Sequence, residues 1–190
     1  MKIKTFFVFM IIIITIFIIY IFNIDNKIYY INISDNNTNY NLQIKRKLEK
    51  IEKLEKYVNI NNKDYRVTDL INIINNNENI SDKQTIQNAL IKADILTIQI
   101  GNNELEYKTD IKDTNELFEY SDELLNDLDK LFKLIRIYDK EKIYFFGYKN
   151  AKNEYFNEIY DYLNLKLKDL CDQYNIIFLD WKKIGGNLFE

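Results

Sequence analysis

Residues 93–105, with the sequence ADILTIQIGNNEL, join a mainly apolar run to a glycine and a group of polar residues. The run is short and rich in Ile and Leu, which is typical of a strand buried on both faces. Similar runs occur at residues 27–33, 57–60, 142–146 and 175–179. The intervals between them are long enough for helices, so the pattern predicts repeated β-α-β units and a parallel sheet.

Apolar residues at helical spacing fill most of these intervals. One stripe contains Leu124, Leu128, Leu131, Phe132 and Ile135, and another contains Phe156, Ile159, Tyr160, Leu163, Leu167 and Leu170. Helices are also predicted over residues 44–55 and 67–74, and Ser81 is predicted to cap a helix that continues to Ala93. The segment 45–56 (KRKLEKIEKLEK) is expected to be a solvated charged helix, and residues 75–79 a loop.

A long apolar segment precedes the first predicted strand. The uncharged run from Thr5 to Phe22 follows Lys2 and Lys4, and its length is close to the roughly 20 residues that cross a bilayer. Because no small-residue cleavage pattern follows, an uncleaved signal anchor is predicted. The lysines place the N-terminus in the cytoplasm. We therefore expect a single-pass cell-membrane protein with an anchor (residues 1–26) and one extracytoplasmic domain (residues 27–190).

The composition limits the chemistry of this domain. With 26 basic and 29 acidic residues, the chain has no basic field for nucleic acid. It contains no histidine, which removes the usual general base of serine and cysteine hydrolases and the commonest metal ligand. The single cysteine, Cys171, falls on the apolar side of a predicted helix and is interpreted as a small buried residue. Neither a cofactor nor a metal site is predicted.

Glycines and acidic residues follow the predicted strands. Asp35 comes just after the first, Gly101 after the third, Gly147 after the fourth and Asp180 after the fifth. Because the carboxyl ends of parallel strands share one edge of the sheet, binding sites in such folds form there. Turn residues also end the strands of any α/β protein, so the spacing alone leaves a site and a set of turns equally open.

The segment 93–105 resembles the third conserved block of the SGNH/GDSL hydrolases, where an apolar strand runs into Gly-x-Asn-Asp. Here that motif reads Gly101, Asn102, Asn103, Glu104. Residues 142–150 and 156–181 are similar to that family's fourth strand, next helix and fifth strand; residues 27–37 and 59–70 suit its first two blocks. The resemblance implies a three-layer, flavodoxin-like fold with a five-stranded parallel sheet. It also implies an esterase or acylhydrolase acting on an acyl ester, a lipid or a glycan.

The family's nucleophile, a serine after the first strand, has no match. The resemblance puts Asn36 at that position and Asp35 before it, with Ser34 in a different register. A carboxamide is no useful nucleophile, and a serine needs a base to activate it. No Asp-x-x-His, which supplies the family's base, occurs before Glu190. The resemblance therefore implies a catalytically impaired, C-terminally truncated relative.

The family's oxyanion hole is partly matched. Asn103 corresponds to the side-chain donor of the third block, and Gly101 to its turn residue. Asp64 falls where the second block has a glycine whose amide donates. With an effective dielectric constant of about 20, a carboxylate there would raise the energy of an oxyanion by roughly 4 kcal/mol at a distance of about 4 Å.

Four functions stay open on these residues. The first is a degenerate SGNH-like domain without the catalytic triad that holds a glycan or lipid. The second is a fragment of an active hydrolase whose gene has an early stop or a frameshift. A third alternative is a membrane-tethered interaction module in which Asn103 only closes a turn. The fourth, carboxylate chemistry by Asp35, Asp64 and Asp180, is supported by no more than their shared edge.

Overall fold

The computed structural model describes residues 27–35, 39–50, 53–106, 113–140, 142–148 and 154–180. Its main sheet contains β1 (Ile28–Ser34), β2 (Leu54–Asn61), β5 (Ile95–Gln99), β6 (Lys142–Phe146) and β7 (Ile177–Leu179). The strands lie in the order β2-β1-β5-β6-β7, and every neighbouring pair is parallel. Numbered within the sheet, this is the 2-1-3-4-5 order of flavodoxin-like folds. The predicted α/β class with a five-stranded parallel sheet is confirmed.

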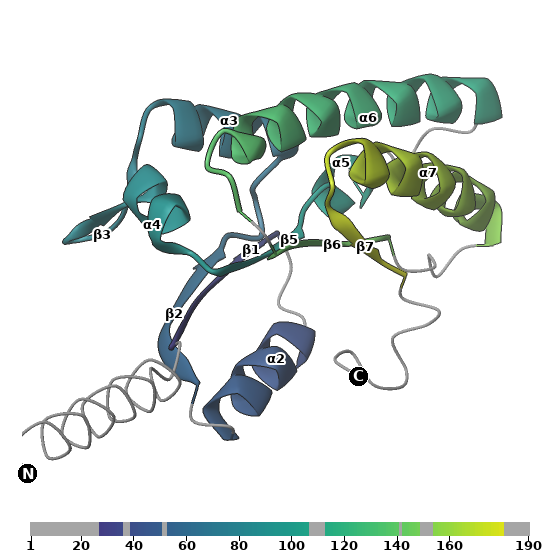
Figure 1. Ribbon diagram of the computed structural model, residues 1–190. Helices are drawn as coiled ribbons and strands as arrows, with labels where there is room; N and C mark the ends of the chain where they lie inside the picture. The colour runs from purple at the N-terminus through teal and green to yellow at the C-terminus, as the bar shows by residue number, and fades with distance from the viewer. Residues whose placement is uncertain are drawn as a thin grey trace, which may run out of the picture.

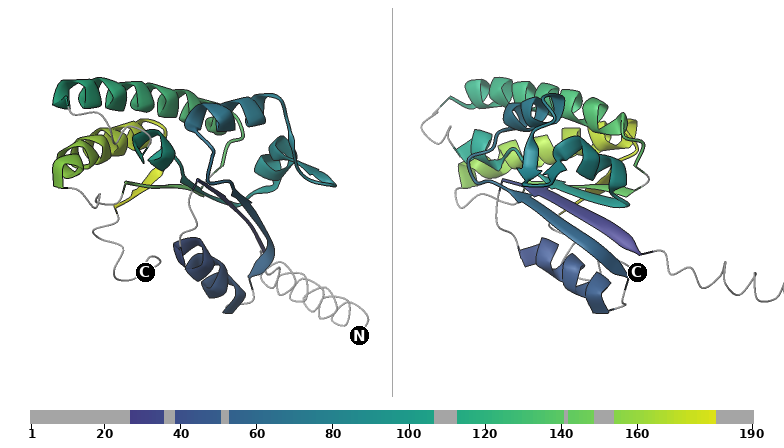
Figure 2. Two further views of the ribbon diagram at one scale, coloured as in Figure 1. Left: turned by 180° about the vertical axis from the view of Figure 1, so that it is seen from behind. Right: turned by 90° about the vertical axis from the view of Figure 1, so that its left-hand side faces the viewer.

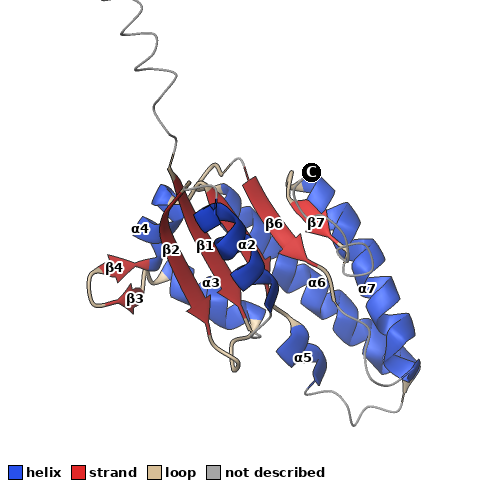
Figure 3. Cartoon of the chain, turned by 90° about the horizontal axis from the view of Figure 1, so that it is seen from below, coloured by secondary structure: helices blue, strands red, loops and turns tan. Residues whose placement is uncertain are grey.

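Helices lie on both faces of this sheet (Figures 1 and 2). Among the described helices, α2 (Asn39–Lys50) lies by itself on one face, as the view from below shows (Figure 3). The opposite face carries α3 (Val67–Asn75), α4 (Ile86–Lys92), α6 (Thr114–Arg136) and α7 (Glu154–Gln173). The short α5 (Asn102–Glu106) follows β5, and a hairpin of β3 (Asn79–Ser81) and β4 (Gln84–Thr85) projects beyond β2.

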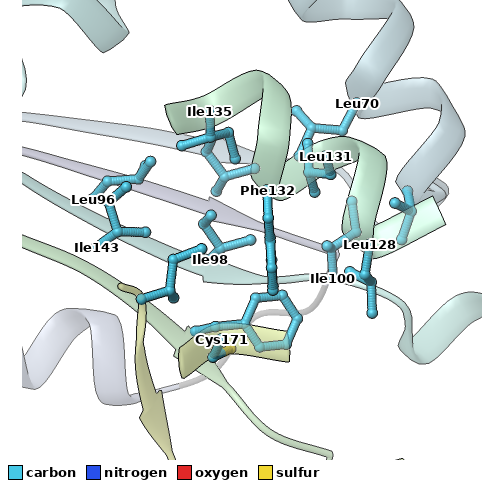
Figure 4. Close-up of a cluster of buried hydrophobic side chains, with 14 of the residues drawn as sticks. Leu70, Leu96, Ile98, Ile100, Leu128, Leu131, Phe132, Ile135, Ile143 and Cys171 are labelled. Atoms are coloured by element: carbon cyan, nitrogen blue, oxygen red, sulfur yellow. The ribbon is translucent and has the colours of Figure 1, made fainter. Parts of the chain in front are cut away.

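The larger hydrophobic core lies between the sheet and the helices of the opposite face (Figure 4). Its central ring, Phe132 of α6, packs edge-on against Phe145 with 5.2 Å between the ring centroids. Cys171 is fully buried in this core, which confirms the interpretation as a small buried residue. A smaller cluster between the sheet and α2 contains Tyr30, Ile44, Ile95 and Phe146. Each fully buried Leu, Ile or Phe stabilises the fold by about 1.5–3 kcal/mol, so the larger core is the main source of stability.

The charged helix ends earlier than predicted. It was expected to continue to residue 55 or 56, but α2 stops at Lys50 and β2 begins at Leu54. Residues from Leu54 onward pair with β1, and the hydrogen bonds of the sheet replace those of a longer helix. Alternating Lys and Glu fit a solvated helix and an exposed edge strand alike, so the sequence could not place this boundary.

The prediction that Ser81 caps a helix is wrong. Ser81 ends strand β3 in the hairpin, and the N-cap of α4 is Thr85, whose hydroxyl accepts a hydrogen bond from the Asn88 amide at 3.4 Å. The Asn-rich loop is also shorter than predicted, because Asn75 belongs to α3 and Asn79 to β3. Asn77 turns the chain with a φ of 51°, a conformation that Asn adopts more readily than most residues.

Residues 1–26, the predicted anchor, lie outside the described residues, and so does Asn36. Within the described ranges, no helix has both the length and the apolar character needed to cross a bilayer.

Candidate functional site

Four loops lie together at the carboxyl-terminal edge of the sheet, following β1, β2, β5 and β6. The amide of Asp35 donates to the carbonyl of Gln99 at 2.9 Å, and the amide of Asn62 donates to the carbonyl of Ser34 at 3.2 Å. These bonds continue the sheet past its last paired residues. They bring Asp35, Gly101, Asn103 and residues 62–66 close together, as the shared edge predicts.

The Asp35 carboxylate is buried, with 3% of the residue exposed, and it accepts several hydrogen bonds from the start of α5. Donors are the Asn102 amide at 2.8 Å, the Asn102 side chain at 3.0 Å and the Asn103 amide at 3.5 Å. Burial raises the pKa of Asp35, and these hydrogen bonds oppose the rise because they favour the charged form. The side chain therefore fixes the turn after β5 and is directed into the protein.

Gly101 has a φ of 105° and lies directly against Tyr148. A Cβ atom at position 101 would be 2.1 Å from the Tyr148 hydroxyl, so only glycine fits this position. That hydroxyl donates to the carbonyl of Ile100 at 3.1 Å, and Tyr148 is fully buried beside Tyr160. An aromatic side chain thus fills the space beside the turn. No motif in the sequence marks Tyr148 for this role.

Both hydrogens of the Asn103 carboxamide are used within the protein. Its Nδ2 atom donates to the carbonyl of Lys63 and, at 2.9 Å, to the carbonyl of Tyr65. Asn103 therefore joins α5 to the loop that follows β2. A donor to an oxyanion needs a hydrogen that points at the reacting oxygen, and in this arrangement the side chain offers none.

Asp64 lies in the same loop and is exposed. Its amide, the other candidate donor, donates to the side-chain oxygen of Asn62 at 3.0 Å. Arg66 follows as the N-cap of α3; its amide donates to the Asp69 carboxylate at 3.0 Å. The loop is thus held by local hydrogen bonds, with the side chains of Lys63, Asp64 and Arg66 on its exposed side.

Glu104, the last residue of the motif that begins at Gly101, carries a buried carboxyl group. Its Oε1 atom accepts from the Val67 amide at 2.5 Å, and its Oε2 atom is buried without a hydrogen-bond partner. Burial raises its pKa, and the nearby Asp35 carboxylate raises it further, whereas the Val67 amide and Arg66 lower it. A carboxylate stabilises a helix N-terminus, here that of α3. Because Glu104 lies 37 residues from Val67 in the sequence, no local pattern marks this role.

The remaining predicted residues are spread out. Ser34 is fully buried within the sheet, and Asn36 lies outside the described residues. Asp180 follows β7 at the far side of the sheet from β1. Within the described part of the chain, no group of three His, Cys, Asp or Glu residues is arranged to hold a metal ion.

Comparison with known proteins bears on the fold of this chain. No family model matches the sequence, and no curated protein matches it either. Solved structures do match. A lipase from a goat rumen metagenome has a TM-score of 0.62 at 20% identity, over 80% of this chain and 79% of the lipase.

Two carbohydrate esterases are similar to a comparable degree. An acetyl xylan esterase matches with a TM-score of 0.57 at 11% identity, over 82% of this chain and 78% of its own. An acetyl-xylooligosaccharide esterase from Geobacillus matches with a TM-score of 0.58 at 16% identity, over 80% of this chain and 75% of its own. The fold is therefore that of the esterases and lipases, in agreement with the resemblance to SGNH/GDSL hydrolases. At these identities the likeness extends to the fold alone.

Proposed function

We propose that this chain is a membrane-anchored, extracytoplasmic SGNH/GDSL-type esterase-like protein that has lost ester hydrolysis. The observation that carries this proposal is the use of the Asn103 carboxamide, whose two hydrogens go to the carbonyls of Lys63 and Tyr65. Removal of one oxyanion-hole donor lowers turnover by about 100- to 1,000-fold in a hydrolase. The amide of Asp64, paired with Asn62, adds no second donor.

The residues available for attack support the same conclusion. Ser34 is fully buried, and the chain contains no histidine to activate it. Loss of the nucleophile or the base costs a serine hydrolase on the order of a millionfold in turnover. Together with the missing donors, this leaves too little catalysis for a working esterase.

We propose that the exposed side of the 62–66 loop binds a ligand without hydrolysing it. Lys63, Asp64 and Arg66 are exposed there, at the edge where ligands bind in open α/β sheets. A glycan, a lipid or another acyl ester matches the substrates named for the similar esterases and lipases. Retention of such a ligand by a membrane-tethered domain requires no catalytic residue.

The alternative function is a membrane-tethered interaction module without a small ligand. One observation favours it: Tyr148 packs against Gly101 and fills the space beside the turn after β5. Binding of acetylated xylo-oligosaccharides, measured by calorimetry with the full chain and with Arg66→Ala, separates the two. A heat of binding that the full chain shows and Arg66→Ala abolishes would support ligand binding. No heat of binding with either protein would support the interaction module.

Hydrolysis is tested with the full chain in detergent and p-nitrophenyl acetate as substrate. We expect release of nitrophenol at the rate of buffer alone. Ser34→Ala and Asn103→Ala are the matched variants. A rate above buffer that either substitution lowers would show an active ester hydrolase and would overturn the proposed loss of catalysis.

A further inference from the structure

Two exposed isoleucines lie at the amino-terminal edge of the sheet, opposite the candidate site. Ile91 lies in the last turn of α4, just before β5, and is 59% exposed. Ile137 ends α6, before β6, and is 73% exposed. A third exposed isoleucine, Ile177 at 46%, opens β7, but it pairs with Tyr144, which is level with Thr97 in the middle of β5, so it does not lie at this edge. Because β5 and β6 are neighbours whose first residues, Ile95 and Lys142, are paired, Ile91 and Ile137 lie at the same edge.

The ends of α4 and α6 are joined at this edge. The ammonium group of Lys140 donates to the carbonyl of Ile91 at 2.6 Å. Lys140 lies three residues after Ile137 in the sequence. Single exposed apolar residues are ordinary on protein surfaces. Ile91 and Ile137 differ from such single residues because they lie on helix ends that the Lys140 hydrogen bond joins.

Lysines accompany the isoleucines. Exposed lysines stand before β1, before β2, in the last turns of α4 and α6, and at the start of β6: Lys27, Lys53, Lys92, Lys133 and Lys142. Basic residues at helix C-termini are expected from the helix dipole, which accounts for Lys92 and Lys133. That effect does not account for the other three, which precede or open strands.

Acidic residues also occur at this edge, but they are fewer. Among the described residues they are Glu55, Asp94, Asp139 and Asp172, all exposed. Asp94 has an internal partner, because its carboxylate accepts from the Tyr29 amide at 2.7 Å. Asp94 and Asp139 both lie near Lys140. Among the described residues of this edge, the exposed lysines therefore outnumber the acidic residues.

The chain reaches this same edge from its apolar N-terminal run. β1 starts at Ile28, at the amino-terminal edge, and the run ends at Phe22. Residues 23–27 span at most about 17 Å when fully extended. An anchor in the bilayer would thus hold this edge close to the lipid headgroups.

We infer that the amino-terminal edge of the sheet docks on a bilayer surface carrying anionic phospholipid headgroups. Lys27, Lys53, Lys92, Lys133 and Lys142 pair with the headgroups, and Ile91 and Ile137 enter the interface between headgroups and acyl chains. This inference rests on the proposed membrane anchor. It orients the domain so that the candidate site faces away from the membrane.

The test places a fluorescent probe at the amino-terminal edge of the sheet in the full-length protein. A nitrobenzoxadiazole probe is attached to Ile137→Cys, and the chain is reconstituted in phosphatidylcholine vesicles with or without about one third phosphatidylglycerol. Leu165→Cys is the matched control, because Leu165 is also an exposed apolar residue, at 62%, and lies on α7. The unaltered chain measures background labelling, since burial raises the pKa of the Cys171 thiol and keeps it unreactive.

Docking predicts that brominated acyl chains quench the probe at position 137 but not the probe at position 165. The quenching requires phosphatidylglycerol and is lost at high salt. Lys92→Gln with Lys142→Gln weakens docking by roughly fivefold for each lysine. Lys166→Gln, on α7, removes a charge elsewhere and leaves the quenching unchanged.

Flotation of the vesicles separates this inference from the anchor. If the chain floats with both kinds of vesicle while position 137 stays unquenched, the anchor holds and docking is wrong. If the chain floats only with anionic vesicles, and the Lys92 and Lys142 substitutions abolish flotation, docking holds and the anchor is wrong. A chain that floats with neither contradicts both.

Discussion

The two edges of the main sheet use their polar side chains in opposite ways. At the carboxyl-terminal edge, Asp35 and Asn103 form hydrogen bonds with the protein itself. At the amino-terminal edge, lysines such as Lys53 and Lys92 are exposed, and isoleucines stand beside them. A parallel sheet normally carries its ligand site at the first of these edges. In this chain, Asp35 and Asn103 at the first edge are used by the fold, whereas Lys53 and Lys92 at the second edge are exposed.

This difference separates a role in folding from a role in binding. A side chain whose donors and acceptors are all satisfied internally stabilises the fold, and its removal is felt as lost stability. An exposed side chain contributes little to stability, so its removal is felt in binding. Substitutions at the two edges should therefore separate cleanly into these classes.

The largest effect is expected from Gly101→Ala. The new Cβ would lie 2.1 Å from the Tyr148 hydroxyl, at a φ of 105°. The clash and the backbone strain together should lower the free energy of unfolding by about 3 kcal/mol or more. Urea denaturation of the variant and the parent chain measures this loss.

Tyr148→Phe is the control for that experiment. Alone it loses the hydrogen bond to the Ile100 carbonyl, at a cost of about 1 kcal/mol. Combined with Gly101→Ala, it removes the nearest clashing atom, so the double variant should be more stable than the sum of the two losses predicts. Simple additivity would mean that Tyr148 moves aside without cost and that the edge is not tightly packed.

Asn103→Ala should have the next largest effect. It removes both hydrogen bonds to the loop after β2, at about 1–2 kcal/mol in total. Faster hydrogen exchange confined to residues 62–66 would locate the loss. An unchanged melting temperature would contradict a structural role and would restore Asn103 as a free donor.

Glu104→Gln tests the buried carboxyl group through pH. Burial raises the pKa of Glu104 in the folded chain, so the protonated form is favoured by folding. Its contribution to stability is fully present below the unfolded pKa, about 4.3, and is lost as the pH rises through the folded pKa. Each unit between the two pKa values costs about 1.4 kcal/mol at higher pH.

The free energy of unfolding of Glu104→Gln should therefore increase relative to that of the parent chain as the pH rises from about 4 to about 8, because glutamine cannot ionise. Urea denaturation across this range measures the difference. Glu116→Gln, in the exposed first turn of α6, is the matched control and should follow the parent profile. A parallel course for Glu104→Gln and the parent would show that Glu104 is not perturbed in the fold.

The strands of this fold could be predicted because apolar runs mark them directly. The run at residues 142–146 coincides with β6, and the others agree with β1, β2, β5 and β7 to within a few residues. The errors fell on polar sequence. Ser81 and Thr85 both suit an N-cap, and only the pairing of β3 with β4 decides between them. The predicted membrane anchor and Asn36 lie outside the described residues and stay predictions.

The site was harder to predict because its contacts span long sequence separations. Asp35 and Asn102 are 67 residues apart, and Asn103 lies 38 residues from Tyr65. A motif identifies Asn103 but not the direction of its hydrogens, which depends on where the loop after β2 passes. Tyr148 carries no motif at all, although it determines that position 101 must be glycine.

The smallest effect on stability is expected at the amino-terminal edge, from Ile137→Ser. Ile137 is mostly exposed, so the substitution should change the free energy of unfolding by less than about 0.5 kcal/mol. Ile135→Ala, two residues earlier in α6, removes a fully buried side chain and should cost about 2–5 kcal/mol. The same Ile137→Ser substitution should weaken contact with anionic vesicles. Quenching by brominated acyl chains of a probe attached at Ile91→Cys measures this contact. A loss of stability above about 1 kcal/mol would mean that Ile137 packs against the protein, and the two edges would then no longer differ in kind.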